Sequence, residues 1–256
     1  MICSDLPMKT TVRLLVVQHE RDTGAGWFGG WLAGAGLTLE TVHPYAGQEL
    51  PPLSGYAGLL VLGGAMAPAD DDEFPWLPAT RTLLAEAVRQ EVPTFGICLG
   101  AELLALGLGG EVRRGNAGPE LGVLSVDLGT EAAGDPVFGA LPAAPRVVQW
   151  HWEEITELPA GAVLLASSPA YRHQAFRVGP AAWGVQGHPE VTGDIAAAWA
   201  REDSPLLAEE GRDPHDLVAE VRDAEAELAG TWRPVAESFA TVVRQFHDEG
   251  RTAAAR

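Results

Sequence analysis

The chain has 256 residues and a formal net charge of −18, from 17 basic and 35 acidic side chains. Hydrophobic residues at 46% and charged residues at 20% are typical of a globular protein that buries one large core. A field this negative repels phosphate backbones and anionic membranes, which argues against nucleic-acid and membrane partners.

Cysteine and lysine are both scarce. The only two cysteines, Cys3 and Cys98, do not indicate a disulfide framework. Residues 1–10 have neither the basic region nor the long apolar region of a secretory signal peptide, so we expect a cytoplasmic protein. Lys9 is the only lysine, which removes a P-loop lysine and a pyridoxal Schiff base from the body of the fold. Met8 is a second candidate for the natural start, besides Met1.

The first half of the chain alternates strands and helices. Hydrophobic periodicity predicts a strand at 12–18, a helix at 24–36, strands at 37–42 and 58–62, a helix at 77–90 and a strand at 92–97. Repeated strand–helix–strand units form a parallel sheet with helices on both faces. In such sheets the site lies beyond the carboxyl ends of the strands.

After residue 110 the pattern changes to short strands separated by turns. We expect strands at 123–128, 146–150, 163–167, 175–178 and 182–186, then helices at 194–199, 216–228 and 235–247. The fold class that follows is α/β, with three layers around a mostly parallel central sheet. We divide the chain into one domain at 10–200 and a helical C-terminal extension at 201–256 that packs on it.

A cysteine between two glycines follows the strand predicted at 92–97. The segment at 94–100 reads TFGICLG, and a helix-forming run begins at 101. This pattern is typical of a nucleophile elbow, in which glycines two residues either side of the nucleophile relieve clashes in a sharp turn. The sulfur of Cys98 would then project at a helix N-terminus, where the helix dipole favours the thiolate.

A candidate base lies ninety residues later, in the sequence HPE at 188–190. Alternate side chains of an extended segment share a face, so His188 and Glu190 can meet, and Pro189 biases His188 toward that conformation. Glu190 would orient the imidazole and complete a Cys98/His188/Glu190 triad. The alternative is a buried structural cysteine with a histidine at a strand end.

These motifs resemble the class I glutamine amidotransferases, whose glutaminase domains carry a G-x-C-x-G elbow and a later H-P-E. Further segments resemble the stand-alone, GMP-synthase-like branch of that family: LGG at 62–64, DDDEFPWL at 70–77, GPELG at 118–122, VQWH at 148–151 and QAFR at 174–177. The similarity covers about residues 12–192 and implies the flavodoxin-like fold of the family.

The resemblance also implies roles for single residues. It places the oxyanion hole at the backbone N–H groups of Leu99 and Gly64, the alternative being that Gly63 and Gly64 form only a tight turn. The substrate contacts that it implies are Gly63, Glu102, His173, Ala175 and Phe176. For His173 a structural role stays open, and Glu102 could instead point outward at the helix start.

The chain departs from the family at three positions near this site. Glu102 stands where the family has glutamine, His173 where it has asparagine, and Gly187 where it has an aromatic residue. We expect Gly187 to leave additional space beside the triad. These departures bear on the substrate more than on the mechanism.

Other charged residues suggest no further site. We interpret the acidic run at 70–73 as a solvated loop, Arg113 and Arg114 as surface residues, and His151 as structural or at the rim of the pocket. No histidine or cysteine spacing indicates a metal site. We therefore expect neither a metal nor an organic cofactor.

The function predicted from these features is release of ammonia from the side chain of glutamine through a thioester on Cys98. The chain has no nucleotide-binding motif, so an acceptor or synthetase half would be a separate protein. A γ-glutamyl hydrolase or peptidase is the alternative enzyme, since some carry glutamate at the position of Glu102. A catalytically silent regulatory or binding module is the alternative from another class.

Overall fold

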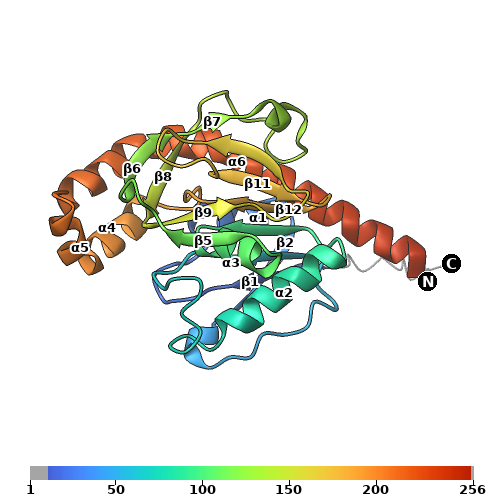
Figure 1. Ribbon diagram of the computed structural model, residues 1–256. Helices are drawn as coiled ribbons and strands as arrows, with labels where there is room; N and C mark the ends of the chain where they lie inside the picture. Colours follow the sequence, from blue (N-terminus) through green and yellow to red (C-terminus); the bar gives the residue numbers. More distant parts are fainter. Residues whose placement is uncertain (1–10, 255–256) are drawn as a thin grey trace, which may run out of the picture.

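A mostly parallel, eight-stranded sheet forms the centre of the protein (Figure 1). The computed structural model describes residues 11–254, so Cys3, Met8 and Lys9 lie outside the described residues. The strand order is β2-β1-β3-β4-β12-β11-β10-β7, parallel from β2 to β12 and antiparallel beyond it. These strands are β1 (Val12–Val17), β2 (Leu37–Val42), β3 (Gly58–Val61), β4 (Thr94–Ile97), β7 (Asp127–Leu128), β10 (Val163–Ser167), β11 (Ala175–Val178) and β12 (Ala182–Val185).

Helices cover both faces of this sheet. Along β1, Leu14 and Val16 belong to one core cluster, whereas Leu15 and Val17 belong to the other, because successive side chains of a strand point to opposite faces. The first cluster includes residues of α1 (Gly26–Gly34) and α6 (Pro214–Ala254), and the second those of α2 (Leu77–Arg89) and α3 (Leu99–Gly107). The predicted three-layer α/β class is confirmed.

The register of the parallel strands brings their carboxyl ends together. Val17 of β1 pairs with Val61 of β3, and Val61 pairs with Gly96 of β4. The chain therefore leaves β3 and β4 at the same edge of the sheet. That edge carries the turn at 62–64 and Cys98, as predicted for a site in this class of fold.

The single strand predicted at 123–128 is wrong. The chain changes sheets at Val126, which is buried between β6 (Glu120–Ser125) and β7. β6 pairs with β8 (Arg146–His151) in a separate two-stranded sheet, whereas β7 pairs with β10 in the main sheet. The alternation of apolar residues is continuous from 123 to 128. It therefore does not show that the first part of this segment pairs with β8 and the second part with β10.

A second small sheet, formed by β5 (Glu111–Arg114) and β9 (Glu153–Glu157), was not predicted. Its strands are mostly charged and lack a clear apolar alternation. Opposite charges face each other across it, since Arg113 pairs with Glu154 and Arg114 with Glu153. This pairing fixes the backbone after Trp152, whose carbonyl oxygen accepts a 2.7 Å hydrogen bond from the N–H of Gly115, and so holds one wall of the cavity described below.

The two helices predicted at 216–228 and 235–247 form one helix, α6, with Pro234 in its interior. A proline usually breaks a helix because it lacks an N–H group and clashes with the preceding turn. Here a continuous buried stripe that includes Leu228, Trp232 and Val235 packs against the sheet across the proline. The packing of this stripe therefore outweighs the loss of a helix hydrogen bond at Pro234.

The remaining helical elements are α4 (Gly193–Glu202), α5 (Ser204–Glu209) and two 3₁₀ turns, η1 (Pro44–Ala46) and η2 (Thr130–Gly134). The helix predicted at 194–199 is thus longer, and α5 was not predicted. Within residues 11–254, no helix is both long enough and apolar enough to cross a membrane.

Candidate active site

Cys98 occupies the turn between β4 and α3 in a strained conformation. Its φ is 49° and its ψ is −110°, a backbone geometry that side-chain-bearing residues rarely adopt. A Cβ added at Gly96 would lie 2.6 Å from the carbonyl oxygen of Gly100, and one added at Gly100 would lie 2.2 Å from that of Val61. Both glycines are therefore needed for so close an approach of the backbone.

The thiol of Cys98 is buried among negative charges. Burial raises its pKa well above the usual value, and the charges of Glu102, Glu190 and Glu153 raise it further, whereas the N–H of Leu99 lowers it. Cys98 does lie at the N-terminus of α3, but loss of water and the nearby carboxylates outweigh the effect of the helix on its pKa in this resting state. A base is required to make the nucleophile.

His188 and Glu190 lie immediately after β12, at the same edge of the sheet. Nδ1 of His188 lies 2.8 Å from Oε1 of Glu190, and both side chains are buried. The backbone N–H of His188 donates to Val148, which fixes the segment, and the ring packs edge-on against Trp199 at 4.7 Å between centroids. With Nδ1 directed at a carboxylate, the imidazole has Nε2 available for the thiol.

Gly63 and Gly64 bring the turn after β3 against this pair. A Cβ added at Gly63 would lie 3.0 Å from Cε1 of His188 and 3.6 Å from Cβ of Cys98. One added at Gly64 would lie 3.0 Å from Cδ2 of Leu99. Leu99 is the first residue of α3, where a backbone N–H has no partner within the helix. The five predicted residues Gly63, Gly64, Cys98, Leu99 and His188 therefore converge.

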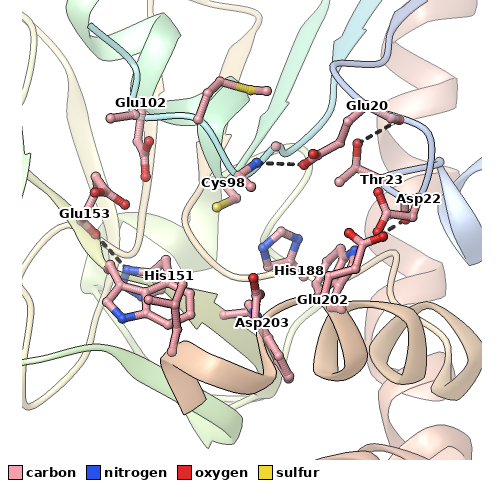
Figure 2. A pocket seen from close by; sticks show the side chains of 18 of the residues that line it. Glu20, Asp22, Thr23, Cys98, Glu102, His151, Glu153, His188, Glu202 and Asp203 are labelled. Carbon is pink, nitrogen blue, oxygen red and sulfur yellow. Dashed lines mark hydrogen bonds between the residues drawn. The ribbon is translucent and has the colours of Figure 1, made fainter. Parts of the chain in front are cut away.

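A cavity of about 310 Å³ opens over Cys98 and His188. Figure 2 shows these two side chains between two groups of carboxylates. Glu102 and Glu153 lie on one side with His151. The other side is lined by Glu20, Asp22, Glu202 and Asp203.

The comparison with known families decides the family of the chain. A model described as "Glutamine amidotransferase class-I" matches residues 32–198. The chain belongs to this family.

Several proteins similar in sequence to this chain are hydrolytic enzymes. The chain is 31% identical over 149 residues to γ-glutamyl peptidase 4 of Arabidopsis thaliana, a match that spans 57% of this chain and 59% of the peptidase. It is 38% identical over 145 residues to one subunit of the glutamine-hydrolyzing GMP synthase of Natronomonas pharaonis, spanning 56% of this chain and 72% of that subunit. A solved glutamine amidotransferase structure from Thermotoga maritima superposes with a TM-score of 0.81 at 29% identity, covering 90% and 98% of the two chains.

Glu102, where the class I family has glutamine, lines the cavity and is only 3% exposed. The outward orientation considered from the sequence does not occur. Its Oε1 accepts a 2.8 Å hydrogen bond from Nε2 of Gln186, which also lies 3.9 Å from the sulfur of Cys98. Burial raises the pKa of Glu102 to about 7, opposed by the hydrogen bond from Gln186.

Gly63 and three further predicted substrate contacts do not line the cavity. Nδ1 of His173 lies 2.7 Å from the carbonyl oxygen of Ile155, which ties the ring to β9. Ala175 and Phe176 are buried in β11, and Phe176 packs over Gly184 of the adjacent strand. In the structure all three residues hold strands together.

Gly187 does not leave space beside the triad, contrary to the prediction from the sequence. A Cβ at this position would lie 2.8 Å from Cγ1 of Val147 and 3.2 Å from Oε1 of Gln149. These two side chains from β8 fill the space next to Gly187. The glycine is therefore a packing adjustment and not an enlargement of the site.

Several residues of the site carry no signal in the sequence. Glu20, Gln186 and Trp199 come from separate segments and meet the predicted residues only in the fold. Arg114, predicted at the surface, is largely exposed but also lines the cavity, 3.6 Å from Glu153. His151, placed at the rim or in a structural role, lines the cavity and has its ring nitrogens near Glu120 and the backbone of Glu153.

The acidic run at 70–73 is more structured than a solvated loop. Asp71 pairs with Arg81 of α2 at 2.6 Å, and Asp70 reaches the cavity wall. Within the described residues, no group of three or more histidine, cysteine or acidic side chains has the geometry to hold a metal ion.

Proposed function

We propose that this protein hydrolyses the γ-carboxamide of glutamine or of a related γ-glutamyl compound through a thioester on Cys98. One observation carries the proposal. A cysteine held in a strained turn lies beside a hydrogen-bonded His188–Glu190 pair, and both Cys98 and His188 open into one cavity. Such an arrangement is suited to acyl transfer by a cysteine nucleophile.

The first half of the reaction forms the thioester. Nε2 of His188 takes the proton of Cys98 as the sulfur attacks the amide carbon, and the carboxylate of Glu190 stabilises the positive charge that develops on the imidazole. The backbone N–H groups of Leu99 and Gly64 would stabilise the oxyanion. His188 then returns the proton to the departing nitrogen, and the C–N bond breaks.

The second half releases glutamate. Water takes the place of the departed amine, His188 accepts a proton from it, and the hydroxyl attacks the thioester carbon. When the C–S bond breaks, the proton returns to the sulfur of Cys98. The thiol is neutral again, in keeping with the raised pKa of Cys98 at rest.

Glu102 would bind the amino-acid end of the substrate. Its carboxylate faces the cavity, and Gln186 occupies only Oε1. The α-ammonium group of a γ-glutamyl compound could donate a charge-assisted hydrogen bond to Oε2, about twice as strong as a neutral one. The same contact suits glutamine and a substituted γ-glutamyl amide.

Two activities follow from this mechanism and differ in the leaving group. Release of ammonia to a separate acceptor or synthetase protein is supported by the relationship to the glutamine-hydrolyzing GMP synthase. A γ-glutamyl peptidase activity is supported by the relationship to γ-glutamyl peptidase 4 and by the room beyond Cys98 and His188. The two activities share every step at Cys98 and His188.

Covalent labelling tests the mechanism without knowledge of the natural substrate. A glutamine-like chloroketone should add its mass to the peptide that contains Cys98, as read by mass spectrometry. Cys98→Ala should lose the label and turnover, and Cys3→Ala, the matched control, should keep both. Turnover that persists in Cys98→Ala would contradict the mechanism. Absence of both label and turnover in the wild type would favour the silent module.

A further inference from the structure

A buried glutamine lies behind the reacting sulfur. Gln186 directly follows β12, is only 2% exposed, and does not line the cavity that Cys98 and Glu102 share (Figure 2). Its backbone N–H donates to the carbonyl oxygen of Gln174 at 2.8 Å, and the backbone N–H of Cys98 donates to Val185, the preceding residue, at 2.8 Å. These bonds hold the side chain of Gln186 beside the nucleophile and behind the wall of the cavity.

The amide nitrogen of Gln186 lies between two groups of the site. Nε2 donates a 2.8 Å hydrogen bond to Oε1 of Glu102 and lies 3.9 Å from the sulfur of Cys98. The amide nitrogen of a glutamine carries two N–H groups. Because one of them is directed at the carboxylate of Glu102, the other is available to the sulfur. Glu102 therefore orients the amide of Gln186 toward the nucleophile.

The amide oxygen of Gln186 indicates that packing alone does not explain this side chain. Oε1 is buried and, in the described part of the chain, has no hydrogen-bond partner. A buried acceptor without a partner is destabilising, and an apolar side chain of similar volume would avoid this loss. The reason for an amide at this position therefore lies in its N–H groups, one on Glu102 and one facing Cys98.

The sulfur of Cys98 needs a donor that stabilises negative charge. Burial raises the pKa of its thiol, and three carboxylates raise it further, those of Glu102, Glu190 and Glu153. The backbone N–H of Leu99 lowers it. In the proposed reaction, however, that N–H turns to the oxyanion of the substrate. Gln186 can still offer its second N–H to the sulfur at that stage, because its amide lies behind the cavity.

The sulfur becomes negatively charged twice in this reaction. It does so first when His188 takes its proton, and again when the C–S bond of the thioester breaks. A hydrogen bond to a charged acceptor is roughly twice as strong as one to a neutral acceptor. The contact of 3.9 Å with the neutral thiol is long and weak, so it should strengthen mainly in these two steps. An interaction that strengthens in this way accelerates the reaction.

We propose, on the basis of the Cys98 mechanism above, that Gln186 is a further catalytic residue. Its second amide N–H donates to the sulfur of Cys98 while the sulfur is negatively charged, and Oε1 of Glu102 holds the amide in that orientation. Gln186 neither gains nor loses a proton. The proton of the thiol moves to His188, and the amide stabilises the charge that stays on the sulfur. Oε2 of Glu102 remains available for the α-ammonium group of the substrate.

The reactivity of Cys98 toward iodoacetamide tests this role without a substrate. Iodoacetamide reacts with the thiolate, so the rate of alkylation of the Cys98 peptide over a range of pH, followed by mass spectrometry, reports how readily the thiolate forms. Gln186→Met has a similar volume and no N–H donor. It should slow alkylation at neutral pH about tenfold and move the midpoint of the profile upward by about one pH unit.

Turnover gives a second readout on the same variant. With a γ-glutamyl anilide, Gln186→Met should lower kcat about tenfold, because the lost donor acts on the charged sulfur. KM should change little, since Glu102 keeps both oxygens for the substrate. A merely structural role would not separate kcat from KM in this way.

Gln149→Met is the matched control. Gln149 is also buried, its Nε2 donates to one side chain, Gln174 at 2.7 Å, and its Oε1 has no partner within the described residues. Its amide nitrogen is directed at Gln174 and not at the sulfur, so Gln149→Met should keep the wild-type alkylation profile. If Gln186→Met fails to fold, Gln186→Asn decides in the same way, because it keeps a buried amide but withdraws it from Cys98 by one carbon atom.

The outcomes separate this inference from the proposed function. An alkylation profile of Gln186→Met that coincides with the wild type, or an equal shift in Gln149→Met, would overturn the role of Gln186 and leave the Cys98 mechanism intact. Failure of the wild type to turn over glutamine and the γ-glutamyl anilide would instead reject the proposed function. A shifted alkylation profile in Gln186→Met would, even then, support the donor at the sulfur.

Discussion

The carboxylate of Glu20 accepts a 2.6 Å hydrogen bond from the backbone N–H of Ala65, the residue that follows Gly64. Glu20 lies beyond the end of β1, and Ala65 lies beyond the end of β3, so the bond joins two loops at the catalytic edge of the sheet. Gly64 is the proposed second donor of the oxyanion hole. The orientation of its N–H therefore depends on how firmly Glu20 holds the next peptide.

Removing this acceptor should slow the chemical step. Glu20→Ala is expected to lower kcat about tenfold, less than the 10²–10³-fold typical for loss of a whole oxyanion donor. Glu20→Gln keeps an acceptor oxygen at the same place and should retain most of the activity. Steady-state measurement of kcat and KM on both variants checks this. Equal losses in the two variants would show that the charge, and not the hydrogen bond, is what matters.

The His188–Glu190 pair should behave as base and orienting group. His188→Ala is expected to lower kcat on the order of 10³-fold, because the neutral thiol then has no base. Glu190→Gln keeps a hydrogen-bond acceptor for Nδ1 and should cost roughly 10- to 100-fold, since only the charge is lost. Turnover of a γ-glutamyl anilide, with circular dichroism as a check of folding, measures both. A series in which Glu190 mattered and His188 did not would reject the assignment.

Glu102 should affect binding of the substrate's amino group. Glu102→Gln is expected to raise KM for a substrate with a free α-amino group by up to roughly tenfold, about 1.4 kcal/mol, and to change little for the N-acylated substrate. The comparison needs both substrates on both proteins. Equal effects on the two substrates, or none, would leave Glu102 with a structural role only.

Glu102 should also make the stability of the protein depend on pH. Its pKa is raised from 4.5 to about 7 by burial, so between these values the folded protein holds a proton that the unfolded chain has lost. Stability therefore falls as pH rises through this window. Glu102→Gln should be nearly neutral at pH 4.5 and stabilising above pH 7, by up to about 3 kcal/mol. Urea unfolding at both pH values measures this, with the exposed Glu209→Gln as the control that should show no such trend.

Gly187→Ala should destabilise the fold, since its Cβ would meet Val147 at 2.8 Å. Overpacking of this kind costs about 1–3 kcal/mol. Adding Val147→Ala should recover part of the loss, because it removes the methyl groups that the new Cβ meets. A Gly187→Ala protein with an unchanged melting temperature would contradict the packing described for this position.

Much of the α/β architecture could be predicted because it depends on local patterns. Buried strands, the glycines on either side of Cys98 and the two-residue spacing of His188 and Glu190 each act over a few residues. The fold class follows from the alternation of strands and helices, and the structure confirms it. The division of the chain at residue 200 and the catalytic roles of the triad stay predictions.

Tertiary structure decided what depends on packing and on loss of water. The start of a helix favours a thiolate at Cys98, but burial among carboxylates has the larger effect and raises the pKa of the thiol. The helices predicted at 216–228 and 235–247 are one helix, because a buried stripe continues along α6 across Pro234. Asp22 and Glu202 are 180 positions apart, and only the fold brings both into one cavity. Local spacing determines which strands and helices form and places Cys98 in the turn between a strand and a helix. The charge and shape of the cavity around Cys98 come instead from residues that are distant from it in the sequence.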